Sequence, residues 1–420
     1  MKKKSFAVVV ISNGPGELTT WVKPVIYELQ NLINLAKSKN DISLRLALVP
    51  CPNATGREYQ VAKGWQEFDL ITSAPNFWKL LINPYKFGVW PDKGIVVFLG
   101  GDQFWSVLLS KRLGYQSITY AEWVARWPRW NYLIAAMNNN VKRKLSKKDQ
   151  KKCVVIGDLM ADINNHNNDS YPTKIKDHKW IAILPGSKKA KLSIGIPYFL
   201  EMAEYISKDN KNLKILIPMA PTTNLDDYLF FQSDKNPITK FYSSRIKNIK
   251  KTKNSVFEYI IETQNKTKIH LISSYPQYEI LKNCILAVTT VGANTAELAS
   301  INIPMFVVLP TQHLEYMNAW DGMIGILAKV SFVNKIITYL LKNWYLKNKK
   351  YFAWPNIKAK KFIVPERIGK YYPKEIAKEV LMLVNNEKAL QEQKYNLSKQ
   401  RGKKGAAKKL AQMIFKAIIN

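Results

Sequence analysis

The chain has 420 residues, more than a single hydrophobic core usually holds, so two domains are expected. Its composition, 47% hydrophobic and 12% aromatic, is globular and excludes a largely disordered protein. The net charge of +33 favours polyanionic partners such as an anionic lipid surface.

Other features of the sequence narrow the range of partners and cellular locations. The sequence contains no nucleic-acid-binding motif, so no nucleic acid is expected as a partner. Because the lysines are spread along the chain, the positive charge has two possible explanations: a membrane partner or a compositional lysine bias. Three distant cysteines without CxxC spacing indicate reduced thiols in the cytoplasm. The apolar run after the first lysines predicts a strand and no signal peptide, and no apolar stretch is long enough to span a membrane.

The first half of the chain alternates apolar runs with helical patterns. Strands are predicted at 6–11, 44–49, 94–99, 117–120 and 154–158, with helices at 19–35 and 104–113. A polar, turn-rich stretch at 164–179 predicts a linker. This rhythm indicates an α/β domain over 1–165.

A second α/β set follows the linker. Strands are predicted at 180–184, 213–218, 285–290 and 305–309, with a helix around 198–206, while 222–268 is assigned no further than helix and loop. Residues 373–420 resemble two amphipathic helices. We therefore predict a second domain over 176–370 and C-terminal helices over 371–420 that pack back on the first domain.

Three glycine-bearing turns follow predicted strands, at 13–16, 184–187 and 291–294. Glycine lets the backbone turn sharply and approach a ligand closely. Each turn alone is typical of any strand-to-helix connection, and none matches the Walker phosphate loop. Three of them in two α/β halves favour a cleft between domains.

The segment 285–310 has strand, turn, helix and strand within few residues. A helix that starts directly after a strand offers backbone N–H groups and a positive dipole end to an anion. Glu297, one turn into that helix, could reach the hydroxyls of a ribose attached to the anion. The alternatives are a sugar-nucleotide pocket and an ordinary crossover connection.

Several motifs resemble those of lipid-A-disaccharide synthase, a glycosyltransferase of the GT-B fold. LPGSKKAKL at 184–192 resembles LPGSR-x-x-E-V, and VIGDLMAD at 155–162 is similar to YVGHPLAD. GANTAELASINIPMFVV at 292–308, YFAWPNIKAKKFIVPE at 351–366 and TYAEWVARW at 119–127 have counterparts in the same order. The resemblance implies two Rossmann-like domains facing across a cleft, with a UDP-sugar in the second and the acceptor mainly in the first.

The resemblance also implies site residues. Gly186, Ser187 and Lys188 would line the diphosphate, Gly292 with Asn294 and Thr295 would form the helix N-terminus over it, and Glu297 would take the ribose hydroxyls. Asn356 matches the family's PN motif and is expected at the cleft. The glycine turn with Gly14 and Gly16 would face the acceptor.

This sequence differs from the family's motifs both in the loop expected to bind the donor and in the loop expected to face the acceptor. Lys188 replaces an arginine and gives up bidentate phosphate recognition while keeping the charge. SNGPGELTTW differs from the family's GETSGD, so the resemblance implies the donor and leaves the acceptor open, as expected of a divergent relative of the family.

Glycosyl transfer needs a base for the acceptor hydroxyl and positive charge for the departing UDP. Asp102, after the strand at 94–99, is the first candidate base, and its alternative role is a helix N-cap. Glu17 in the first glycine turn is the second, and its alternative is an acid near a helix dipole. The four histidines are scattered, so no metal site and no cofactor beyond the UDP-sugar are predicted.

Two stretches, 76–90 and 326–354, mix large aromatic residues with lysines. Such stretches suit a peripheral contact with an anionic membrane surface, and the alternative is amphipathic helices packed on the core. We predict a cytoplasmic, metal-independent, inverting hexosyltransferase acting on a lipid-linked acceptor at the inner face of the membrane, with an oligomer as an open question. The rivals are a UDP-sugar epimerase or hydrolase of the same fold and a non-catalytic nucleotide-sugar or polyanion-binding protein.

Overall fold

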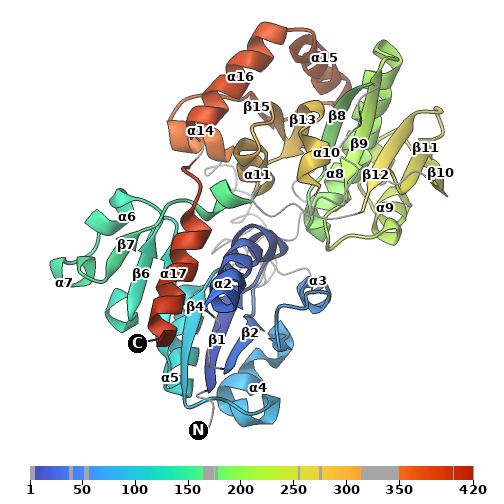
Figure 1. The fold of residues 1–420 in the computed structure, drawn as a ribbon. Coiled ribbons are helices and arrows are strands. Elements are labelled where there is room, and N and C mark those ends of the chain that lie inside the picture. Colours follow the sequence, from blue (N-terminus) through green and yellow to red (C-terminus); the bar gives the residue numbers. More distant parts are fainter. Residues whose placement is uncertain are drawn as a thin grey trace, which may run out of the picture. The chain divides into compact units, whose positions relative to one another are not determined.

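The computed structural model describes residues 5–36, 41–51, 56–163, 175, 178–253, 256–273, 277–313, 350–400 and 402–419, and every structural statement below concerns these residues. The chain divides into two compact units: unit 1 comprises Met1–His166 with Gly402–Asn420, and unit 2 comprises Asn167–Arg401. Each unit is built on its own sheet (Figure 1).

Unit 1 contains a seven-stranded sheet in the order β3-β2-β1-β4-β5-β6-β7, in which all paired strands are parallel. Alternate residues of one strand enter opposite cores, Val8 and Val10 on one face and Ala7 and Val9 on the other. Burial on both faces explains the uninterrupted apolar runs in the sequence. The strands are β1 (Ser5–Ser12), β2 (Asp41–Leu48), β3 (Leu70–Thr72), β4 (Lys93–Phe98), β5 (Gln116–Ala121), β6 (Leu133–Ala136) and β7 (Cys153–Val155).

Helices cover both faces of this sheet. One core includes residues of α2 (Lys23–Leu35) and α17 (Ala406–Ile419), and the other includes residues of α4 (Phe77–Ile82) and α5 (Gln103–Leu113). The predicted helix at 19–35 starts differently, since α1 (Pro15–Glu17) and a π-helical turn (Leu18–Val22) precede α2. The smaller helices are α3 (Glu58–Lys63), α6 (Asn139–Arg143) and α7 (Lys147–Gln150).

The last helix, α17, is bound to unit 1 by a buried carboxylate. Asp162 is 1% exposed, and its two oxygens accept the backbone N–H groups of Gly405 and Ala407, each at 2.7 Å. A carboxylate at this place satisfies N–H groups that have no partner within the helix. α17 lies beside α2 (Figure 1), and its Leu410 and Ile414 are buried in the core that residues of α2 share.

Unit 2 contains an eight-stranded sheet in the order β10-β11-β12-β9-β8-β13-β14-β15. It is parallel from β12 to β15, while β10 and β11 form an antiparallel edge. This edge, with α9 (Leu225–Gln232), occupies the region that the sequence assigned no further than helix and loop. The strands are β8 (Lys179–Leu184), β9 (Leu213–Pro218), β10 (Ile246–Lys251), β11 (Tyr259–Thr263), β12 (Lys268–Ile272), β13 (Cys284–Thr290), β14 (Met305–Pro310) and β15 (Glu366–Gly369).

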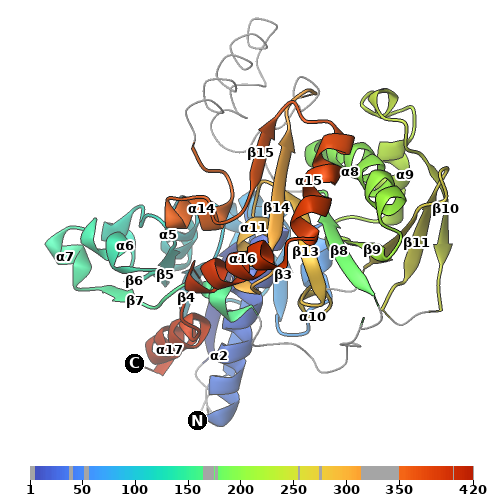
Figure 2. The same ribbon diagram turned by 90° about the horizontal axis from the view of Figure 1, so that it is seen from above.

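The helices of unit 2 form two groups. Residues of α8 (Lys189–Asp209) and α15 (Pro373–Val384) share the core of one sheet face, and Figure 2 shows α15 beside α8. α11 (Asn294–Ser300), α14 (Trp354–Ala359) and α16 (Glu387–Gln400) contact one another, and α10 (Tyr278–Leu281) precedes β13. The predicted two helices over 373–420 are wrong in number, since α15, α16 and α17 occupy this segment. The first two belong to unit 2 and the last to unit 1.

Candidate functional site

Two glycine turns of unit 2 lie at the same edge of its sheet. β8 and β13 are neighbouring parallel strands, with Leu184 opposite Thr289 at their carboxyl ends. The turns that follow contain Gly186 at φ 108° and Gly292 at φ 150°, both in the left-handed region that favours glycine. The structure therefore brings together the two turns from which the sequence predicted a donor pocket.

Lys191 connects these two turns. Its Nζ donates a hydrogen bond of 2.8 Å to the carbonyl oxygen of Val291. A Cβ added at Gly292 would lie 2.9 Å from that Nζ, and one added at Gly186 would lie 3.0 Å from the Cβ of Lys191. The ammonium group is thus held against the edge formed by both turns.

The sequence prediction placed the charge on Lys188 and missed Lys191. Lys188 is the N-cap residue of α8, and its carbonyl oxygen accepts the N–H groups of Lys191 and Leu192. Ser187, in the same turn, is half-buried. Residues three apart lie on the same face of a helix, so the spacing from 188 to 191 could have indicated the second lysine.

Glu297 is half-buried in α11, where its Oε2 accepts a hydrogen bond of 3.3 Å from the hydroxyl of Tyr278. Asn294, half-buried, is the first residue of this helix. The hydroxyl of Thr295 donates to the carbonyl oxygen of Gly292 at 2.8 Å and accepts from the N–H of Trp354 at 3.0 Å. Thr295 thus fixes the turn and joins it to α14.

Asn356 requires a correction, because its side chain is fully buried and already saturated. Its Nδ2 donates to the Val364 carbonyl at 2.8 Å and to Glu366 Oε1 at 2.7 Å. Its Oδ1 accepts the N–H groups of Ile363 at 2.7 Å and Val364 at 3.0 Å. An amide has two donor hydrogens and two acceptor sites, so none is left for a ligand. We assign Asn356 to holding residues 363–366 in place, in contrast to the predicted ligand contact.

In unit 1, Glu17 folds over the first glycine turn. A Cβ added at Gly14 would lie 2.1 Å from Glu17 Oε2, and one added at Gly100, after β4, would lie 3.1 Å from the Cβ of Glu17. β1 and β4 are paired, so the turns after both strands meet at one edge. Gly16, half-buried in the same turn, accepts the hydroxyls of Thr19 and Thr20 on its carbonyl oxygen at 3.0 and 2.8 Å.

Asn13, which the sequence did not single out, lies at the same place. A Cβ added at Gly101 would come 3.5 Å from its Cγ. The residue is 8% exposed, and within the described part of the chain its Oδ1 has no hydrogen-bond partner. A buried acceptor without a partner is costly, and a ligand donor such as a hydroxyl would satisfy it.

Asp102 has the role of a helix N-cap, which the sequence had left open as the alternative to a catalytic base. It is the N-cap of α5, where Oδ1 accepts the N–H of Phe104 at 2.9 Å. Its Oδ2 forms an ion pair of 3.3 Å with Nη1 of Arg126, and both side chains are about half exposed. Both carboxylate oxygens are therefore engaged in contacts within unit 1.

Exposed aromatic rings form a continuous chain on unit 1. Trp78 contacts Trp105 at a centroid distance of 5.1 Å, Trp105 contacts Phe104 at 5.8 Å, Phe104 contacts Trp127 at 5.5 Å, and Trp127 stacks on Trp130 at 5.3 Å. Trp78, Phe104, Trp127 and Trp130 are 37% to 52% exposed. Lys111 lies over the Trp130 ring at 4.2 Å. We call these five rings the aromatic chain; most of the second predicted patch, 326–354, lies outside the described residues.

The described residues contain no group of three or more His, Cys, Asp or Glu side chains arranged to hold a metal ion. In the same part of the chain, no helix has the length and apolar character needed to cross a membrane.

Comparison with known proteins gives sequence relatives of one kind. The chain is 26% identical over 277 residues to lipid-A-disaccharide synthase of Sulfurihydrogenibium sp. (strain YO3AOP1), covering 63% of this chain and 59% of that protein. It is 26% identical over 242 residues to lipid-A-disaccharide synthase of Wigglesworthia glossinidia brevipalpis, covering 56% of this chain and 49% of that protein. The matches thus span 59% and 49% of the lengths of these relatives. No model of a known protein family matches the chain.

Solved structures show the fold. The S. aureus MnaA–UDP co-structure aligns with a TM-score of 0.55 at 12% identity, over 99% of this chain and 97% of that chain. UDP-GlcNAc 2-epimerase from Neisseria meningitidis bound to UDP-GlcNAc gives 0.51 at 13% identity, over 98% and 100%. The glycotransferase of kitacinnamycin gives 0.50 at 11% identity, over 99% and 100%. The predicted α/β fold of GT-B type is confirmed.

Proposed function

We propose that this chain, a divergent relative of the lipid-A-disaccharide synthases, is a glycosyltransferase that moves a sugar from a UDP-sugar to a lipid-linked acceptor. The observation that carries the proposal is the pair of glycine turns joined by Lys191 at the carboxyl edge of the unit 2 sheet. Open α/β sheets bind their ligands at this edge. Because one similar structure holds UDP-GlcNAc, we propose an N-acetylglucosamine-type donor.

In this proposal, unit 2 binds the donor. Lys191 and Lys188 neutralise the diphosphate, while the turns with Gly186 and Gly292 let the backbone approach it. The carboxylate of Glu297 accepts hydrogen bonds from the ribose hydroxyls, with Tyr278 holding its orientation. This arrangement supplies positive charge to the leaving group without a metal ion.

Transfer with inversion then occurs in one step. The acceptor hydroxyl oxygen attacks the anomeric carbon, the bond from that carbon to the UDP oxygen breaks, and UDP leaves with the electron pair. Glu17 takes the proton of the hydroxyl as general base. Glu17 is preferred as the base because its side chain lies against both Gly14 and Gly100, where the turns after β1 and β4 meet. The unpartnered Oδ1 of Asn13 would accept a hydrogen bond from another acceptor hydroxyl.

The assignment of the base is tested by two isosteric variants. We expect Glu17→Gln to abolish transfer while UDP binding persists. Asp102→Asn should retain most of the activity and lose at most about 1 kcal/mol of stability, since it keeps an N-capping oxygen. Full activity in Glu17→Gln, with inactive but folded Asp102→Asn, would reverse the assignment.

The aromatic chain supports a lipid-linked acceptor. Exposed tryptophans next to lysine and arginine suit the headgroup layer of an anionic membrane. We propose a cytoplasmic protein that contacts the inner face of the membrane through this surface. Flotation with phosphatidylglycerol vesicles should be weakened by Trp127→Ser with Trp130→Ser and unchanged by Tyr395→Ser, an exposed aromatic residue on unit 2. Equal flotation of both variants would contradict this role.

The rival reaction is suggested by the structural likeness to UDP-GlcNAc 2-epimerases. Purified protein incubated with UDP-GlcNAc alone separates the two, because a transferase leaves the donor essentially unchanged without an acceptor. Formation of an epimer or of free sugar would favour the epimerase or hydrolase. A thermal-shift panel of nucleotide sugars, followed by mass spectrometry of products on a lipid extract, identifies the substrates. Binding without any product would favour a non-catalytic protein.

A further inference from the structure

Unit 2 contains a cavity of about 1020 Å³ at the edge of its sheet opposite to the proposed donor turns. Trp180, Lys214 and Lys268 line it, and they lie at the amino ends of the parallel strands β8, β9 and β12. The C-terminal end of α8 and the turn between β11 and β12 complete the wall. The cavity is therefore separate from Gly186 and Gly292, which follow the carboxyl ends of their strands.

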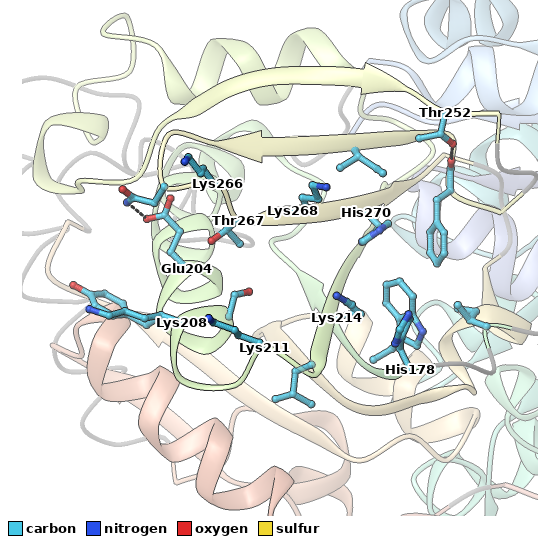
Figure 3. A pocket seen from close by; sticks show the side chains of 18 of the residues that line it. His178, Glu204, Lys208, Lys211, Lys214, Thr252, Lys266, Thr267, Lys268 and His270 are labelled. Atoms are coloured by element: carbon cyan, nitrogen blue, oxygen red, sulfur yellow. Dashed lines mark hydrogen bonds between the residues drawn. The ribbon is translucent and has the colours of Figure 1, made fainter.

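The described residues that line the cavity are strongly basic. Five lysines surround it, whereas Glu204 supplies the single carboxylate among the lining residues described. In Figure 3, Lys266 and Lys268 lie on one side and Lys208, Lys211 and Lys214 on the other. Five ammonium groups with a single carboxylate give the cavity a positive potential, which attracts an anion.

Two buried polar atoms of the wall also have no partner. Trp180 is 3% exposed and Glu204 is 9% exposed, and both line the cavity. Within the described part of the chain, Trp180 Nε1 and Glu204 Oε1 form no hydrogen bond. The other oxygen of Glu204 accepts from Asn265 Nδ2 at 2.9 Å, which holds the carboxylate in place. Such atoms are normally satisfied, so this indole N–H and this carboxylate oxygen are candidate contacts for a ligand in the cavity.

The tryptophan is also held rigidly. Its ring stacks on Phe257 at a centroid distance of 4.8 Å and meets His270 edge-on at 5.0 Å. The Nδ1–H of His270 donates to the carbonyl oxygen of Ile215 at 3.2 Å. The indole N–H donor is thus fixed beside the lysines, which is typical of a preformed binding site.

We propose that this cavity binds a multiply phosphorylated ligand, with its phosphoryl groups on the lysines and a hydroxyl group on Glu204. Ammonium groups and an N–H donor recognise phosphoryl oxygens, while the carboxylate oxygen accepts from a hydroxyl. The ligand is either a soluble polyphosphorylated compound or the phosphorylated headgroup of a lipid. The inference is independent of the proposed glycosyl transfer.

Inorganic tripolyphosphate is the probe for the shared chemistry. Its binding to the full chain is measured by isothermal titration calorimetry for wild type and for Lys214→Gln with Lys268→Gln. The matched control, Lys374→Gln with Lys378→Gln, removes the same charge from the exposed face of α15. Lys191→Gln tests whether the anion binds at the donor turns instead. Circular dichroism establishes that each variant is folded.

We expect saturable binding that weakens at least tenfold in the cavity variant and less than twofold in the control pair. Vesicles containing phosphatidic acid distinguish the sources: binding of vesicles alone, lost in the cavity variant only, supports the lipid headgroup. Absence of saturable binding to both probes overturns the proposal. Equal weakening in the control pair, or loss only in Lys191→Gln, also overturns it. If the cavity pair does not fold, Lys266→Gln in the turn between β11 and β12 replaces it, with the same outcomes.

Discussion

Replacing Lys191 by methionine tests the donor site most directly, because methionine keeps the length of the side chain and removes its charge. The Nζ lies 2.8 Å from the Val291 carbonyl, and a Cβ at Gly292 would come within 2.9 Å of it. A hydrogen bond to a charged group contributes about 1.5–3 kcal/mol. If a phosphoryl oxygen makes this contact, the Kd for UDP should rise roughly ten- to hundredfold.

The assay is titration of UDP into the wild type and three variants by calorimetry. Lys189→Met is the matched control, since this exposed residue occupies the same helical turn. Lys188→Met tests the residue favoured by the sequence and should weaken binding less than Lys191→Met. The unfolding temperature without UDP reports any damage to the fold. Wild-type affinity in folded Lys191→Met would refute the reasoning, because the charge at the two turns would then be irrelevant to the ligand.

Three further predictions concern stability and reactivity. Asn356→Ala should lower the free energy of unfolding by about 2–4 kcal/mol, measured in urea, because two buried N–H groups lose their acceptor. Burial lowers the pKa of His270, and the hydrogen bond from its ring to a backbone carbonyl opposes this shift only in part. On acidification, His270 is therefore protonated at a higher pH in the unfolded chain than in the folded protein. The free energy of unfolding should therefore fall as the pH drops below about 7, and it should fall less steeply in His270→Asn. Thermal melts at several pH values measure this dependence, and an equal pH dependence in wild type and variant would contradict the prediction. Burial raises the pKa of Cys153 and Cys284, so Ellman's reagent should label Cys51 first, and rapid labelling of all three would be the contrary result.

Local patterns were sufficient to predict the two sheets and most of their strands. Parallel strands buried on both faces appear in the sequence as short apolar runs, and the glycines that follow them mark the turns. The antiparallel edge of β10 and β11 was not predicted, because β10 is largely exposed and reads as a polar, lysine-rich stretch. The C-terminal helices were predicted to pack back on the first domain, but no local pattern identified the residue that holds α17: Asp162 lies 243 positions before Gly405.

For the site, the sequence by itself determined which segments carry it, since glycine turns after buried strands must lie at the carboxyl edge of a parallel sheet. Only the tertiary structure decided which side chains meet there. Lys191 contacts Val291, 100 positions away, and no local pattern encodes such a pair. The sequence offered Asp102 as a candidate base and Asn356 as a ligand contact, yet their hydrogen bonds are used within the protein. The residue type determines which hydrogen bonds a side chain can make, and the neighbours in the folded structure determine which of these are left for a ligand.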